Sequence, residues 1–171
     1  MELPVEQFRT KAEQELFDLF EGAERALPGA RDPFVSGLRR DAIKAYGRLG
    51  LPHRRIEAWK YTDLRARLSE IHPLIKAEGI PVDEAALVRA LGPDMARLPA
   101  YRLVVVEGDL RADLSDIAGL KAAGVDAVPL AQALEKPPAW LEGALARINP
   151  REDDAVLALN TALMTGGAAL H

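Results

Sequence analysis

The spacing of apolar residues at the start of the chain constrains the fold more than any other feature. Across residues 5–27, apolar side chains recur at steps of three and four, which places them on one face of an α-helix. Pro28 and Gly29 end this helix, because neither residue favours its continuation. A second helix is predicted to begin at Asp32, a capping residue that precedes a proline, and to end near Gly50.

Later segments predict further helices and a small set of strands. A β-branched run at residues 101–106 indicates a strand, residues 107–109 a turn, and residues 110–114 a partner strand that completes a hairpin. A further short strand is expected at residues 125–128. The remaining predicted helices cover residues 63–71, 82–91, 140–148 and 156–164. The sequence therefore predicts an α+β fold that is mainly helical, with its strands from about residue 101.

These elements suggest three regions along the chain. We expect a helical N-terminal region at residues 1–95 and a mixed α/β region at residues 96–165 that packs on it. Gly166 and Gly167 end the last predicted helix, and residues 166–171 then resemble the start of an extended element. Because this element breaks off within a few residues, we expect the chain to be part of a longer protein.

The composition argues against several kinds of function. The chain has no cysteine, so it offers no disulfide, no cysteine nucleophile and none of the thiolates that usually hold an iron–sulfur cluster or a structural zinc. The net charge of −4 does not favour binding along a polyanion. The N-terminus lacks the pattern of a signal peptide, and no run approaches the ~20 apolar residues of a membrane span. A cytoplasmic location is therefore expected.

The residues that usually carry catalysis or bind metals are not grouped in the sequence. His53, His72 and His171 are far apart, and none has the spacing of a helical metal pair. Phosphate-loop and serine-nucleophile motifs are absent. Neighbouring carboxylates are better explained as solvated helix faces or acidic first turns, at Glu13 with Glu15, Asp83 with Glu84, and Asp153 with Asp154. We therefore expect no catalytic, cofactor-binding or metal-binding residues, and no enzymatic activity.

A basic segment is the strongest remaining signal. Residues 39–67 contain nine basic and three acidic residues, a balance of +6, and three aromatic residues lie among them. Basic and aromatic residues at 54–67 are compatible with a module that binds single-stranded nucleic acid. The other interpretation is a loop in which Trp59 and Tyr61 are core anchors, and the negative net charge of the chain favours it. A possible docking patch for a partner consists of Arg54, Arg55, Lys60 and Arg65.

Three segments share their order and motifs with one protein family. Residues 50–64 contain the string Glu-Ala-Trp-Lys-Tyr-Thr, residues 101–108 read Tyr-Arg-Leu-Val-Val-Val-Glu-Gly, and residues 158–167 end in Met-Thr-Gly-Gly. Together they resemble the N-terminal part of the SufB/SufD family of iron–sulfur cluster assembly proteins, and within it the SufD members. The third segment is similar to the stretch that precedes the β-helix of these proteins.

The resemblance implies a helix-rich N-terminal domain that continues into a right-handed parallel β-helix, with residues 166–171 as the start of a truncated β-helix. It implies a non-catalytic scaffold subunit of the SUF assembly complex, which in the full-length protein pairs with SufB and binds the ATPase SufC. Family residues at the cluster-assembly interface have no counterparts here, so no cofactor is expected in this fragment. The residues that match the family signature, and that we expect to be structural, are Glu57, Trp59, Tyr61, Thr62 and Asn160.

Overall fold

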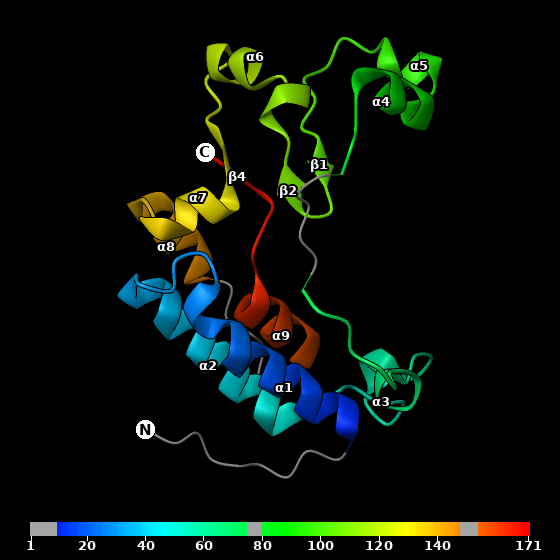
Figure 1. The fold of residues 1–171 in the computed structure, drawn as a ribbon, viewed down its shortest axis with the longest axis vertical. Coiled ribbons are helices and arrows are strands. Elements are labelled where there is room, and N and C mark those ends of the chain that lie inside the picture. Colours follow the sequence, from blue (N-terminus) through cyan, green and yellow to red (C-terminus); the bar gives the residue numbers. More distant parts are fainter. Residues whose placement is uncertain (1–9, 75–79, 148–153) are drawn as a thin grey trace. The chain divides into compact units, whose positions relative to one another are not determined.

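The computed structural model describes residues 10–74, 80–147 and 154–171 (Figure 1). The chain divides into two compact units. The first unit comprises residues 1–73 and 134–164, and the second comprises residues 74–133 and 165–171. Each unit is therefore assembled from two separate stretches of sequence.

The first unit begins with helix α1 (Lys11–Ala23), which a 3₁₀ turn at Glu24–Ala26 extends. Thr10 caps it through a reciprocal capping box, because its hydroxyl accepts from the Glu13 N–H while the Glu13 carboxylate accepts from the Thr10 N–H. The sequence predicts a helix over residues 5–27, and the structure confirms its central part. Residues 5–9 lie outside the described residues.

Helix α2 (Pro33–Leu49) follows the predicted limits closely. The Asp32 carboxylate accepts hydrogen bonds from the N–H groups of Phe34 and Val35, each at 3.0 Å. These bonds satisfy donors that the first turn of a helix leaves without a partner. Gly50 ends the helix, as its position in the sequence predicts.

The first unit has further elements, and the last two of them come from its second stretch of sequence. They are the 3₁₀ turn at Glu57–Trp59, α3 (Leu64–Arg67), α8 (Ala139–Leu145) and α9 (Ala155–Leu163). Helix α9 packs against α2, as Figure 1 shows. The interior of this unit is mainly apolar, although Glu13, Arg39 and Thr161 are also buried. Its buried apolar side chains are Ala12, Leu16, Phe20, Leu27, Val35, Ala42, Ile43, Ala45, Tyr46, Leu51, Leu134, Leu141, Leu145, Ala155, Ala158 and Ala162.

The second unit consists of short helices and two small antiparallel sheets. The elements described in it are α4 (Glu84–Leu91), α5 (Pro93–Ala96), β1 (Val105–Val106), β2 (Asp109–Leu110), the 3₁₀ turn Ala112–Leu114, α6 (Ile117–Ala122), β3 (Ala127–Pro129) and β4 (Ala168–Leu170). Helix α7 (Leu130–Glu135) follows β3 directly in the chain. The mainly helical α+β fold is confirmed.

Strands β1 and β2 form the predicted hairpin, with Val106 opposite Asp109. The two residues between them, Glu107 and Gly108, have φ values of 48° and 91°. Positive φ at both central positions is the geometry of the two-residue turn that matches the twist of a hairpin. The strands themselves are shorter than the predicted segments 101–106 and 110–114, because each pairs over two residues.

Strands β3 and β4 pair antiparallel, with Ala127 opposite Leu170 and Pro129 opposite Ala168. The backbones of Asp126 and His171 then exchange two hydrogen bonds of 2.9 and 3.0 Å beyond the last strand pair. The extended element expected at residues 166–171 is therefore present as β4. Its partner is a strand earlier in the same chain.

The division into units differs from the predicted regions 1–95 and 96–165. Residues 74–95 belong to the second unit, and residues 134–164 belong to the first. The physical reason is that α9 packs on α2, which is a contact between segments far apart in the sequence. Hydrophobic periodicity indicates which face of a helix is buried but does not identify its partner.

Candidate functional site

The segment with the family signature follows α2 and forms a closed loop. The Arg65 N–H donates to the Pro52 carbonyl at 3.2 Å, so the two ends of residues 52–65 meet. Successive turns fill the loop, with hydrogen bonds from Ile56 N–H to the His53 carbonyl at 2.9 Å and from Trp59 N–H to the Ile56 carbonyl at 2.8 Å. We call residues 52–65 the signature loop. Compact loops with joined ends are often functional surfaces.

A single carboxylate of α1 holds both ends of the signature loop. Glu13 Oε1 accepts from the Leu51 N–H at 2.8 Å and from Arg65 Nε at 2.9 Å. The Glu13 side chain is 1% exposed, so it is not on a solvated helix face. It lies in the first turn of α1, which is the other position that the sequence suggested. A buried carboxylate is tolerated here because the guanidinium balances its charge and several donors satisfy its oxygens. The loop is therefore anchored to the core of the first unit.

Two residues at the end of α2 complete this anchor. Gly50 has φ of +66°, and a Cβ atom there would lie 2.6 Å from Glu13 Oε1. Only glycine fits that approach without strain. The Tyr46 hydroxyl donates to the backbone carbonyl of Glu13 at 3.3 Å. Burial raises the pKa of Tyr46 well above its usual range, and the negative charge of Glu13 adds to the rise.

The four residues predicted as a docking patch separate into two groups. Lys60 pairs with Glu57 at 2.6 Å, and Arg65 is half-buried against Glu13. Both of these cations therefore have a carboxylate partner within the first unit. Arg54 and Arg55 are exposed, and neither makes a salt bridge among the residues that the structure describes.

The aromatic residues of the loop also differ from each other. Trp59 is half-buried, which is compatible with an anchor. Tyr61 is 91% exposed, so it is not the core anchor that the sequence suggests. Lys60 Nζ lies 5.3 Å from the centre of the Tyr61 ring, within the range of a cation–π contact. Among the other signature residues, Glu57, Thr62 and Asn160 are exposed, and their structural role stays a prediction.

Sequence reasoning missed a second polar centre, in the core beside α9. Arg39 is 1% exposed, and its guanidinium donates to the carbonyls of Ala162, Met164 and Pro28 at 2.8, 2.7 and 2.9 Å. It thereby caps the C-terminal end of α9 with a positive charge, which opposes the helix dipole. Burial lowers the pKa of Arg39 to about 10.

The position of Arg39 in α2 is the sequence signal that could have predicted its burial. Arg39 is four residues after Val35 and three before Ala42, and both of these neighbours are fully buried. Such spacing places all three on one face of α2. The sequence analysis considered Arg39 only as one charge of the basic segment and therefore did not predict that it is buried.

The histidines do not converge in the structure. Within residues 10–74, 80–147 and 154–171, no three histidine, aspartate or glutamate side chains are grouped as a metal site. His53 Nδ1 accepts from the Arg55 N–H at 3.2 Å, whereas His72 and His171 are exposed. The expectation that this chain holds no cofactor or metal remains a prediction. Within the same residues, no helix is both long and apolar enough to cross a bilayer.

The fold defines a class of protein, a mainly helical α+β protein with a surface loop that a buried carboxylate anchors. The profile of the SufBD protein N-terminal region matches residues 10–171, and the chain therefore belongs to this family. Membership implies a role in iron–sulfur cluster assembly. Proteins of this family are generally non-catalytic scaffolds. No curated protein and no solved structure gives a significant match to the chain.

Proposed function

We propose that the chain is the N-terminal domain of a SufD-type subunit, a non-catalytic scaffold of the cytoplasmic SUF complex. The observation that carries this proposal is the family match over residues 10–171. The string from Glu57 to Thr62 supports the SufD assignment within that family. The absence of cysteine from the sequence supports a role in binding other subunits, since thiolates are the usual protein ligands of iron–sulfur clusters.

The partners of the complete protein follow from the same assignment. In the full-length subunit, the region that continues this chain pairs with SufB and binds SufC. The domain itself supplies a packed helical core and an anchored surface loop. Such a domain acts by contact with other proteins, and no substrate is transformed on it.

The nucleic-acid alternative at residues 54–67 gains no support. A stacking platform requires aromatic faces open to a base. Trp59 is half-buried, so of the two aromatic residues in this segment only Tyr61 is open to solvent. The chain also carries a net charge of −4, which repels a polyanion at long range.

Co-expression tests the SufD assignment. The full-length gene is expressed with a tagged SufB, a tagged SufD or a tagged SufC subunit, and each mixture is purified through the tag. We expect a stable complex with SufB and no complex with SufD alone. The reverse result would assign the chain to the SufB branch of the family. Failure to bind SufC or either subunit would contradict the scaffold role.

Reconstitution of the isolated chain tests the absence of a cluster site. The 171-residue chain is incubated with iron and sulfide without oxygen and then desalted. We expect no stoichiometric cluster absorbance. A cluster that stays bound to this chain after desalting would show that the domain is more than a docking module.

A further inference from the structure

We propose that Arg54, Arg55, Arg67 and Tyr61 form a docking surface for an acidic segment of a partner protein. We call these four residues the arginine–tyrosine surface. The proposal goes beyond the assignment to the SufD branch and does not depend on it. It also revises the patch expected from the sequence, because two members of that patch are already occupied.

The positive charges of this surface are not balanced within the first unit. Lys60 and Arg65 have carboxylate partners at 2.6 and 2.9 Å. By contrast, Arg54, Arg55 and Arg67 are exposed, and no salt bridge reaches any of them among the described residues.

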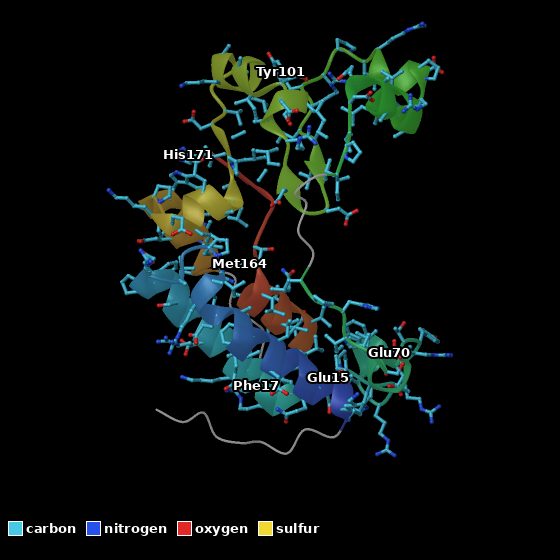
Figure 2. The ribbon with its side chains drawn as sticks, in the orientation of Figure 1. Glu15, Phe17, Glu70, Tyr101, Met164 and His171 are labelled. Carbon is cyan, nitrogen blue, oxygen red and sulfur yellow. The ribbon has the colours of Figure 1, made fainter. Side chains whose placement is uncertain are left out.

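The acidic residues near these arginines in the sequence, Asp63 and Glu70, form no salt bridge with them among the described residues. The Asp63 carboxylate is occupied as the cap of α3, where it accepts from the Ala66 N–H at 3.0 Å. Glu70 is exposed, beyond the end of α3. Figure 2 shows nitrogen-tipped side chains that reach away from the ribbon around α3, near the label of Glu70. A local excess of guanidinium groups therefore faces solvent.

The backbone that carries the surface is fixed before any partner binds. The signature loop is closed by the bond between Arg65 and Pro52, and Glu13 holds Leu51 and Arg65 on the same oxygen. Arg67 follows the closing residue by two positions, within α3. A preformed surface binds with a smaller loss of conformational entropy than a flexible tail. The anchor therefore restrains the backbone of this exposed loop.

The residue types favour a protein partner. Arginine and tyrosine are enriched at the energetic centres of protein interfaces, whereas lysine is depleted there. Tyr61 leaves 91% of its surface exposed, which is a large apolar area for a residue of a closed loop. A guanidinium binds a carboxylate through two parallel hydrogen bonds, which gives direction as well as attraction. An acidic segment with an apolar residue fits both features.

The charge distribution favours an acidic protein over a nucleic acid. The segment 39–67 carries +6 while the whole chain carries −4, so the rest of the chain carries −4 − 6 = −10. This negative charge opposes the binding of a long polyanion more than the binding of a short acidic segment. Three free guanidinium groups also neutralise few phosphates, which gives weak binding to nucleic acid at physiological salt.

Fluorescence anisotropy tests the proposal on the 171-residue chain at low salt. The probe is a fluorescein-labelled glutamate-rich peptide with a central pair of leucines. We expect saturable binding that Arg54→Glu with Arg55→Glu weakens by about tenfold or more, because two attractive charges become repulsive. Tyr61→Ala should weaken binding by about tenfold, and Tyr61→Phe should retain it, because the ring supplies the contact.

A matched double variant controls for overall charge. Arg25→Glu with Arg31→Glu makes the same change in net charge at exposed positions beyond the other end of α1. We expect this control to change the affinity by less than about twofold, since solvent and salt screen distant charges. All substituted residues are exposed, so helical circular dichroism should stay unchanged in each variant.

Four outcomes would overturn the proposal. An equal loss of affinity in the control variant would show that the change in net charge alone explains the effect. Equal binding of a peptide with glutamine in place of glutamate, or no binding of either peptide, would exclude recognition of acidic groups. Tighter binding of single-stranded oligo-dT than of the peptide would assign the surface to nucleic acid.

Discussion

The two units of the molecule are stabilised by different means. The first unit contains nearly all of the buried apolar side chains, including Phe20 and Tyr46. In the described part of the second unit, the buried apolar residues are only Leu110, Ala133 and Ala169. Large apolar residues of the second unit are instead exposed, at Val88, Leu91, Met95, Leu98, Tyr101, Val105 and Leu170. A difference of this kind predicts a difference in local stability.

The second unit relies on hydrogen bonds around its hairpin. The backbones of Arg102 and Asp116 are joined at 2.9 Å, and the Asp116 carboxylate accepts from the Arg102 N–H at 2.7 Å. The Ser115 hydroxyl accepts from the Val104 N–H and donates to the Arg111 carbonyl. Each such bond contributes little net free energy, because water competes for the same groups. We therefore expect the second unit to open at lower free energy than the first.

Truncation of a core side chain should show the largest effect. Phe20→Ala is expected to lower the free energy of unfolding by about 4 kcal/mol, because it leaves a cavity in the first unit. Leu91→Ala in α4 is the matched control, and its side chain is 42% exposed, so we expect a loss below about 1 kcal/mol. Urea unfolding followed by circular dichroism measures both. Equal losses would show that the two units have equally packed interiors.

Removal of the buried guanidinium should have the next largest effect. Arg39→Met keeps the apolar stem but leaves one buried and two partly buried carbonyl groups without their donor, at a cost of about 3 kcal/mol. The neighbouring Arg40 is exposed and pairs with Glu24 at 2.6 Å. Arg40→Met should cost less than about 1 kcal/mol, as surface pairs do. A stable Arg39→Met variant would mean that the end of α9 does not depend on this cap.

Alkaline pH should destabilise the first unit through Tyr46. Its pKa in the folded state is raised from the usual 10.0, so its contribution to stability is complete below pH 10 and declines as the pH rises further. The decline should approach about 1.4 kcal/mol per pH unit, because the unfolded chain ionises first.

Tyr46→Phe isolates this contribution, since Arg39 and the other basic groups are unchanged in it. Chemical unfolding at a series of pH values from neutral to above 10 measures both proteins. The phenylalanine variant should lose less stability than the parent over that range. Parallel curves would contradict the burial of this hydroxyl in the folded state.

The smallest loss of stability is expected from a substitution that affects the second unit alone. Ser115→Ala removes the acceptor of the Val104 N–H and is expected to cost about 1 kcal/mol. Amide hydrogen exchange should show faster exchange around the β1–β2 hairpin, while protection in α2 and α9 stays the same. Faster exchange in α2 as well would show that the two units unfold as one.

Local signals in the sequence were sufficient for much of the fold. Asp32 before a proline set the start of α2, and the pair Glu107 and Gly108 set the hairpin turn. The helix expected at residues 63–71 is a single turn at Leu64–Arg67, because the backbone of Leu68 is extended. The helical spacing of Leu64, Leu68 and Ile71 did not reveal this early end. The short helices α5, α6 and α7 were not predicted, since segments of four to six residues are too short to show a period.

The candidate site was less predictable than the fold. The sequence identified the signature loop but not its anchor, because Glu13 is far from residues 52–65 along the chain. A carboxylate among the neighbouring charges Lys11 and Glu15 also resembles a surface residue. Only the tertiary structure shows that Glu13 and Arg65 neutralise each other in the interior. Pairs of this kind cannot be derived from residue spacing.

The placement of Glu13 has a consequence for protein engineering. A graft of residues 51–65 onto another scaffold would lose its shape unless a helix supplied an acidic side chain at the same place. Glu13 and residues 51–65 would therefore have to be transferred together, even though 38 residues separate Glu13 from Leu51. Homologues in which Glu13 is replaced should also differ at Arg65, its partner in the loop.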